Sequence, residues 1–151
     1  TALVADTGVH RLYQARDAER RLVAVKTLHE SRASDPEERA MLAHEAWLGL
    51  RLTERYTGQL KNGLKGAPAD DPGFVRVHEV AGASALYSVF DWHGGRTLEQ
   101  MLDAPGATPA PVTEVVLVAM QLVRALGRLH RFGVIHRDIK PGNLHRGDDG
   151  R

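Results

Sequence analysis

Short apolar segments separated by polar turns fill the first part of the chain. Residues 9–15 and 22–28 are two such segments, and the polar connection between them has the length of a hairpin turn. A second pair of segments, residues 74–80 and 85–90, surrounds a turn of small residues. This pattern predicts a mostly antiparallel sheet.

The pattern between the two strand pairs predicts one main helix. Asp35 can cap its start, and Pro36 suits the first helical position. Glu38 stands three residues after the cap, as in a capping box. We expect this helix to run to about Leu52, and we expect residues 57–73, which contain several Gly and Pro, to form an exposed loop.

The second part of the chain is predicted to be mainly helical. A capping box at residues 97–100 opens a short helix. After a Pro-rich break at residues 105–111, apolar residues recur at helical spacing through Phe132. The end returns to short strand-like pieces with a hairpin turn signal at residues 149–150. The flexible glycine pair at residues 94–95 is the natural boundary between the two parts.

Composition and charge narrow the class of protein. Hydrophobic residues make up 42% and charged residues 26% of the 151 residues, which is typical of a soluble folded domain. The net charge of +1 argues against a nucleic-acid partner and against a polybasic membrane patch. No apolar run approaches the roughly 18 residues that a membrane span needs. Cysteine is absent, which excludes disulfides and permits the cytoplasmic location that we expect.

The strongest chemical signal is a polar segment that follows the long second helix. Residues 136–143 have the sequence HRDIKPGN, which resembles the catalytic loop of protein kinases. The alternative for these residues is a polar turn with solvated charges.

The resemblance implies a role for each polar residue of this loop. Asp138 would accept or orient the proton of the substrate hydroxyl, and Asn143 would bind a magnesium ion through its amide oxygen. Lys140 would reach the transferred γ-phosphate, as in serine/threonine rather than tyrosine kinases. Such positioning and charge neutralisation are what phosphoryl transfer requires.

A second signal is the sequence VAVK at residues 23–26, which resembles the third strand of the kinase small lobe. Alternation along a strand puts Ala24 and Lys26 on one face. By resemblance, Ala24 would contact the adenine of ATP, and Lys26 would bind its α- and β-phosphates. Taken alone, a strand that ends in Lys is more often a solvated edge.

Glu45 lies within an apolar stripe that Met41, Leu48 and Leu52 form on the first main helix. A carboxylate on a core-facing stripe needs a partner, because an unpaired buried charge is costly. We expect that partner to be Lys26, which matches the family's lysine–glutamate pair. The alternative is that Glu45 lies at the margin of the stripe and binds a nearby Arg or water.

Residues 86–95 resemble the fifth strand and hinge of the kinase fold. Phe90 would be the gatekeeper, and the backbones of Asp91 and His93 would hydrogen-bond to the edge of the adenine. The other expected adenine contacts are Val4 and Leu12 above the ring and His145 below it, where the family usually has Leu.

The glycine-rich loop of the family is eroded in this chain. Ala5, Thr7 and His10 stand where three glycines are usual, and only Gly8 remains nearby. Those glycines let backbone amides approach the phosphates closely, so the departure puts phosphate cradling in doubt.

No Asp-Phe-Gly motif occurs, and the chain ends at Arg151, where the turn before that motif is expected. We therefore expect a truncated catalytic domain without the principal metal-binding Asp. Such a fragment would not catalyse alone, and the helix at residues 113–132 would expose apolar surface.

These features together predict an α+β protein with a protein-kinase-like fold. Residues 1–93 would form the small lobe, an antiparallel sheet with one main helix, together with the hinge. Residues 94–151 would form the first part of a mainly helical large lobe. Lys26 from the sheet and the Asp138–Asn143 couple would converge across one nucleotide-sized crevice.

The expected function is ATP- and Mg²⁺-dependent phosphorylation of Ser or Thr in proteins, with an overall similarity to bacterial kinases. Two alternatives stay open. The eroded glycine-rich loop would suit a pseudokinase that serves as a scaffold. A small-molecule phosphotransferase of the same fold is disfavoured by Arg137 and Lys140.

Overall fold

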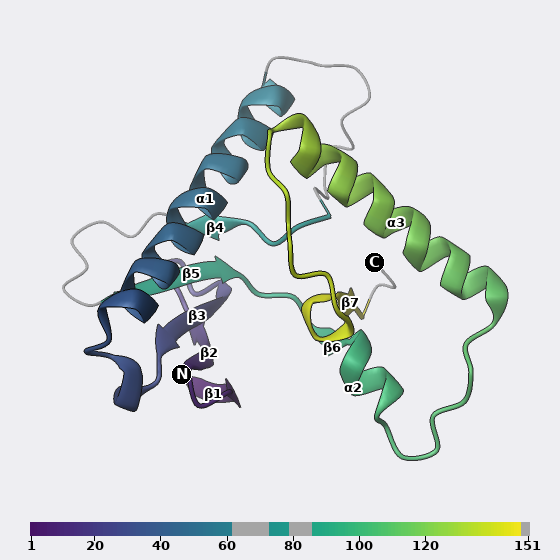
Figure 1. The fold of residues 1–151 in the computed structure, drawn as a ribbon, viewed down its shortest axis with the longest axis horizontal. Helices are drawn as coiled ribbons and strands as arrows, with labels where there is room; N and C mark the ends of the chain where they lie inside the picture. Colours follow the sequence, from purple (N-terminus) through teal and green to yellow (C-terminus); the bar gives the residue numbers. More distant parts are fainter. Residues whose placement is uncertain (62–72, 79–85, 149–151) are drawn as a thin grey trace. The chain divides into compact units, whose positions relative to one another are not determined.

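The computed structural model describes residues 1–61, 73–78 and 86–148, which belong to two compact units. The N-terminal unit comprises residues 1–70 and 75–92, and the C-terminal unit comprises residues 71–74 and 93–151. Figure 1 shows the elements of both units along the chain.

A five-stranded sheet in the order β1-β2-β3-β5-β4 forms the N-terminal unit, and every neighbouring pair is antiparallel. Its strands are β1 (Ala2–Asp6), β2 (His10–Arg16), β3 (Leu22–Leu28), β4 (Val77–His78) and β5 (Tyr87–Asp91). The predicted hairpin of β2 and β3 is confirmed. Strand β1 is not among the predicted strands, and all five of its residues are exposed.

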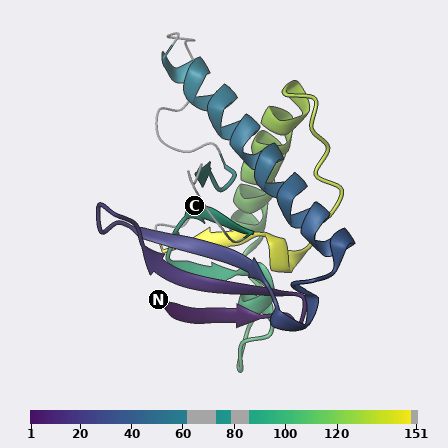
Figure 2. The ribbon, with the colours of Figure 1, turned by 90° about the vertical axis from the view of Figure 1, so that its left-hand side faces the viewer.

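The main helix α1 (Pro36–Lys61) follows β3 and a short 3₁₀ helix, η1 (Glu30–Arg32). It packs on β3, β4 and β5 and crosses one face of the sheet (Figure 2). Its predicted cap is confirmed, because Asp35 accepts hydrogen bonds from the backbone N–H groups of Glu37 and Glu38.

The predicted end of α1 at Leu52 is wrong, because the helix continues to Lys61. No Pro interrupts this extension, and the hydroxyls of Thr53 and Thr57 bond to backbone carbonyls one turn earlier. Residues 57–61 are therefore helical rather than part of the predicted loop. The rest of that loop, and the predicted turn between β4 and β5, lie outside the described residues.

The side of α1 that faces the sheet differs from the predicted stripe. Leu42 is completely buried, whereas Met41 is 64% exposed. Neighbouring positions on a helix point about 100° apart, so the burial pattern is turned by about one residue from the prediction. Gly49 explains the orientation, because a Cβ at this position would collide with the Val77 side chain. The helix therefore approaches β4 closely at Gly49.

The C-terminal unit contains β6 (Gly95–Thr97), α2 (Leu98–Leu102), α3 (Val112–Arg131), η2 (Pro141–Asn143) and β7 (His145–Gly147). The predicted capping box of α2 is confirmed. The Thr97 hydroxyl accepts from the Gln100 N–H, and the Gln100 side chain accepts from the Thr97 N–H. The predicted turn at residues 149–150 lies outside the described residues.

Strands β6 and β7 form a two-stranded antiparallel sheet. Gly95 has a φ of 115°, and a Cβ there would collide with the backbone of Arg146 and Gly147. This glycine is therefore required for the pairing of β6 with β7. The sequence predicts only a flexible boundary at residues 94–95 and does not indicate this packing role.

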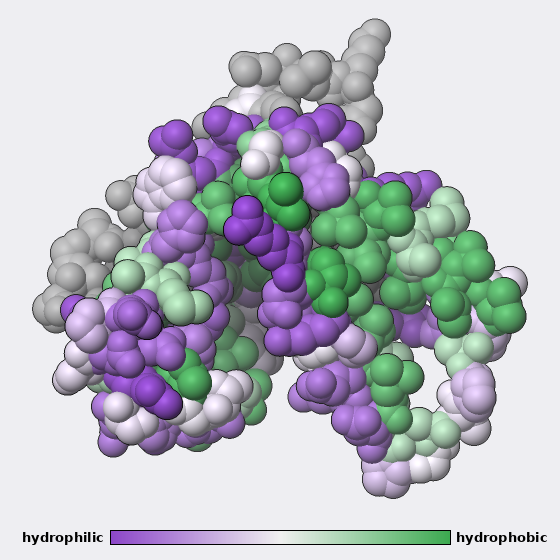
Figure 3. All heavy atoms as spheres, viewed as in Figure 1, coloured by the Kyte–Doolittle hydropathy of each residue, from purple (hydrophilic) through white to green (hydrophobic). Residues whose placement is uncertain are grey.

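Helix α3 buries Ala125 and Leu129 but leaves much of its apolar surface exposed (Figure 3). The exposed apolar side chains on it are those of Val112, Val115, Val116, Leu117, Met120 and Val123. Among the described residues, no helix is both long enough and apolar enough to cross a membrane.

Candidate active site

Lys26 and Glu45 form an ion pair in the N-terminal unit. The Lys26 ammonium lies 2.9 Å from Oε1 and 2.7 Å from Oε2 of Glu45. The Glu45 side chain is 46% exposed and that of Lys26 is 24% exposed. The sequence pattern suggests a buried carboxylate, but the structure leaves that of Glu45 partly exposed. The structure nevertheless gives Glu45 the partner expected from the resemblance, rather than a nearby Arg.

The register of the sheet places the expected adenine contacts beside Lys26. Leu12 lies directly opposite Lys26, and Phe90 lies directly opposite Ala24. Directly opposed residues of antiparallel strands share a face, so these four residues lie on one face of the sheet. Val4 lies where the register between β1 and β2 shifts.

Ser88 is the other direct neighbour of Lys26 in the sheet. It is only 3% exposed, and its hydroxyl has no hydrogen-bond partner among the described residues. His10 lies near the ion pair. Burial lowers the pKa of its imidazole, and the positive charge of Lys26 lowers it further.

The turn between β1 and β2 is closed by Asp6, a residue that sequence reasoning missed. One oxygen of its carboxylate accepts the Gly8 N–H at 2.9 Å, and the other accepts Arg11 Nε at 2.9 Å. The Gly8 N–H, and after it Arg11, lower the pKa of Asp6. An Asp two residues before a Gly is a turn signal that could have identified this contact. The N–H of Gly8 is therefore already bonded to an anion of the chain itself.

Asp91 is the last residue of β5, and its backbone N–H donates to the Arg76 carbonyl at 3.1 Å. This N–H is consequently occupied. Any contact of the Asp91 backbone with a nucleotide falls to its carbonyl oxygen.

Asp138 is the centre of a polar cluster in the C-terminal unit. Its Oδ2 lies 3.0 Å from Lys140 Nζ and 2.8 Å from Asn143 Nδ2. The hydrogen bond from Lys140, followed by that from Asn143, lowers the pKa of Asp138. The carboxylate is therefore held ionised, with Oδ1 as the oxygen that neither of these bonds uses.

The backbone around Asp138 has an uncommon conformation. Arg137 has a φ of 65°, in the left-handed region that few residues other than Gly adopt. The N–H of Asp138 donates to the Nδ1 atom of His136 at 3.3 Å, so the imidazole braces the loop. Strained backbone of this kind persists only where the surroundings fix it, and it is often found at active sites.

Asn143 belongs to η2, which begins at Pro141. Its amide nitrogen donates to the carboxylate of Asp138 and, at 2.9 Å, to the backbone carbonyl of the same residue. The amide oxygen consequently points away from these acceptors. It is the atom of Asn143 that could bind a cation.

His145 in β7 lies opposite Thr97 in β6. Burial lowers the pKa of its imidazole, and the nearby His93 lowers it further. The two histidines expected to contact adenine thus lie near each other within the C-terminal unit.

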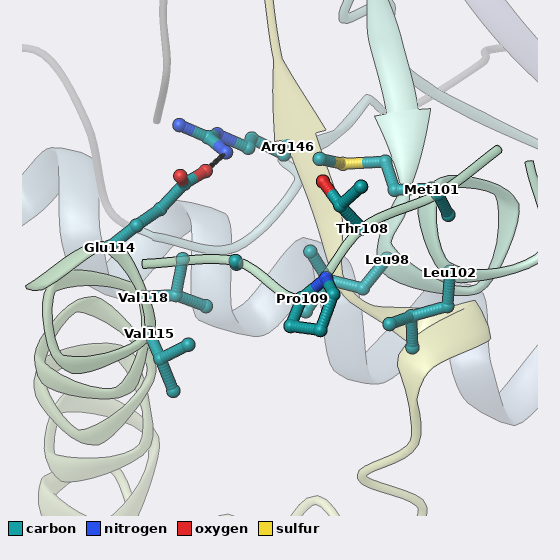
Figure 4. Close-up of a pocket in the computed structure, with 11 residues that line it drawn as sticks. Leu98, Met101, Leu102, Thr108, Pro109, Glu114, Val115, Val118 and Arg146 are labelled. Atoms are coloured by element: carbon teal, nitrogen blue, oxygen red, sulfur yellow. Dashed lines mark hydrogen bonds and ion pairs between the residues drawn. The ribbon is translucent and has the colours of Figure 1, made fainter. Parts of the chain in front are cut away.

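An apolar cavity of about 460 Å³ lies between α2 and the start of α3 (Figure 4). The Glu114–Arg146 ion pair forms part of its lining. None of the site residues predicted from the sequence line it. This cavity is therefore separate from the candidate catalytic residues.

The sequence of the chain matches that of known kinases over most of its length. The family model of the protein kinase domain matches residues 8–146. The serine/threonine-protein kinase PknE of Mycobacterium bovis is 31% identical over 144 residues, covering 94% of this chain and 22% of PknE. A probable serine/threonine-protein kinase of Streptomyces coelicolor is 29% identical over 143 residues, covering 91% of this chain and 18% of that protein. The chain thus spans about a fifth of the length of these relatives.

Solved kinase domains have the same fold. The crystal structure of the Mycobacterium tuberculosis PknI kinase domain matches with a TM-score of 0.68 and 19% identity, over 97% of this chain and 52% of that chain. A mutant of that domain gives a TM-score of 0.70 and 20% identity, over 99% and 55% of the two chains. At this identity the likeness shows the fold alone. It confirms the predicted α+β, protein-kinase-like fold.

Proposed function

Because this chain belongs to the protein kinase domain family, we propose that it supplies nucleotide-binding and catalytic residues of a bacterial serine/threonine protein kinase. The reaction would transfer the γ-phosphate of ATP to Ser or Thr hydroxyls of proteins in the cytoplasm. The observation that carries this proposal is the cluster of Asp138, Lys140 and Asn143. Residues 1–93 would act as small lobe and hinge, and residues 94–151 as the first part of the large lobe.

Asp138 would receive the hydrogen bond of the substrate hydroxyl at Oδ1, because Lys140 and Asn143 both bind Oδ2. A carboxylate held in this way is ionised and oriented before the substrate arrives, so it can accept or orient the proton of the hydroxyl. Lys140 would stabilise the negative charge on the transferred phosphoryl group.

The residues present fit a magnesium ion and ATP. Mg²⁺ prefers oxygen ligands and is commonly bound by one or two protein side chains together with substrate phosphates. Asn143 would supply its amide oxygen, since its nitrogen is bonded to Asp138. When bound, the ion neutralises charge on the phosphate oxygens.

Lys26 would bind the α- and β-phosphates, and Glu45 would hold its ammonium in place. The proximity of Leu12, Ala24 and Phe90 on the same sheet face supports an adenine site next to this pair. Further adenine contacts would come from Val4, the backbones of Asp91 and His93, and His145.

A second candidate function is that of a pseudokinase that binds partners without phosphoryl transfer. The contact between Asp6 and Gly8 favours it, because a carboxylate occupies the amide that would otherwise be available to a phosphate. Weak nucleotide binding would follow from this arrangement.

Two measurements on the protein that contains these 151 residues separate the candidates. Calorimetry with Mg²⁺ and ATP tests binding, and transfer of labelled γ-phosphate tests turnover on a generic protein substrate, an aminoglycoside and a sugar. The kinase proposal predicts binding and transfer to the protein substrate. Weak binding or binding without transfer would support the pseudokinase, and transfer only to a small molecule would contradict both.

A further inference from the structure

The Asp91 side chain at the end of β5 is held by two residues of β4 and its N-terminal flank. Its Oδ2 lies 2.6 Å from Arg76 Nε, and its Oδ1 lies 2.6 Å from His78 Nε2. The carboxylate is only 19% exposed, whereas the side chains of Arg76 and His78 are 46% and 41% exposed. Both carboxylate oxygens and the backbone N–H of Asp91 are thus bonded to the same short segment.

The segment that holds Asp91 is itself fixed. Val77 lies between Arg76 and His78, is 4% exposed, and pairs with Phe90. Its N–H donates to the Thr53 hydroxyl of α1 at 3.0 Å. Since β4 is anchored to the main helix, Arg76 and His78 project from a rigid support.

The electrostatics of Asp91 agree with this geometry. Burial opposes ionisation of the carboxylate, but the hydrogen bonds from Arg76 and His78 outweigh it and lower the pKa of Asp91. The side chain of Arg21 also contributes a positive charge from the turn before β3. Asp91 is therefore an ionised residue whose carboxylate binds the Arg76 guanidinium and the His78 imidazole, and its orientation is strongly constrained.

We propose that Arg76 and His78 are positioning residues for nucleotide selection: by holding the Asp91 carboxylate, they fix the peptide whose carbonyl accepts the 6-amino group of adenine. The inference rests on the proposed kinase function. A carbonyl oxygen can only accept a hydrogen bond, and along the adenine edge the 6-amino group is the donor. A purine with a carbonyl at position 6 would place two acceptors against each other, which costs binding free energy.

ATP and inosine triphosphate (ITP) test this inference, because they differ at position 6 and share their phosphates. In the double variant Arg76→Met/His78→Phe, we expect the Kd of ATP to rise about tenfold while that of ITP changes little. The preference for ATP over ITP therefore falls about tenfold. Both constants are measured by calorimetry on the protein that contains these 151 residues.

Two control variants separate this effect from others. Arg32→Met removes an ion pair with Asp35 in the same unit and leaves both constants unchanged. Lys26→Met weakens the binding of ATP and of ITP equally, because it removes a contact with the phosphates that both nucleotides share. Thermal unfolding checks the fold of each variant. Asp91→Asn, which keeps the size of the side chain, provides the test if the double variant does not fold.

An unchanged ATP/ITP preference in the double variant, or in Asp91→Asn, overturns this inference and leaves the kinase proposal intact if Lys26→Met still weakens binding. Failure of the unaltered protein to bind ATP would overturn the kinase proposal, and this inference with it.

Discussion

At the Lys26–Glu45 pair, nearly half of the Glu45 side chain is exposed, so water screens the attraction between the two charges. An exposed pair of this kind contributes about 0–1 kcal/mol to stability. Its value lies in orientation, because two hydrogen bonds fix the ammonium beside the residues that would contact adenine.

We therefore expect Glu45→Gln to change function far more than stability. The free energy of unfolding should change by less than about 1 kcal/mol. The Kd of ATP should rise about tenfold, because the ammonium loses its charged partner. Glu54→Gln, which alters an exposed position on the same helix, is the matched control. Equal effects of the two variants on ATP binding would contradict the role of Glu45.

The pKa of Asp138 tests whether Lys140 and Asn143 act on its carboxylate as the structure indicates. Lys140 is the largest cause of its lowered pKa, so Lys140→Ala should raise the pKa toward 3.8, whereas Lys140→Arg should keep it low. Carboxyl ¹³C NMR measures both values. The lowered pKa favours folding above the unfolded-state value, and this contribution is lost as the pH falls through the folded-state value. An unchanged pKa in Lys140→Ala would refute the assigned cause.

The elements of the fold divide into those that local sequence determines and those that need tertiary contacts. The β2–β3 hairpin and the capped start of α2 are predicted correctly, because alternation and a capping box act over a few residues. The C-terminal end of α1 and its rotation against the sheet are not predicted correctly. Gly49 and Leu42 orient this helix against β4 and the sheet, and β4 comes much later in the chain.

The rotation of α1 gives a prediction at the scale of the element. Leu42→Ala should lower the free energy of unfolding by about 2–5 kcal/mol, because it opens a cavity at a fully buried position. Met41→Ala, at the adjacent exposed position, should change it by less than about 0.5 kcal/mol. Chemical denaturation measures both. Equal losses would contradict the observed rotation of α1.

Over the whole molecule, candidate residues are present in both compact units: Lys26 and Glu45 in one, and Asp138, Lys140 and Asn143 in the other. The sequence identifies Lys26 and the Asp138 set because each lies in a short motif, and it identifies Glu45 because this residue falls within an apolar stripe at helical spacing. Arg76 and His78 could not be found in the same way. The Asp91 contacts depend on the register between β4 and β5, which no local spacing encodes.

The central claim is that Asp138 acts in phosphoryl transfer, and the variant Asp138→Asn tests it most directly. The amide keeps the size of the side chain but cannot accept the proton of a substrate hydroxyl. Turnover and the Kd of ATP are measured on the protein that contains these 151 residues. We predict that turnover falls by about 10²–10⁴-fold while the Kd of ATP changes by less than about twofold. Unchanged turnover would contradict the assignment of Asp138 as a catalytic residue.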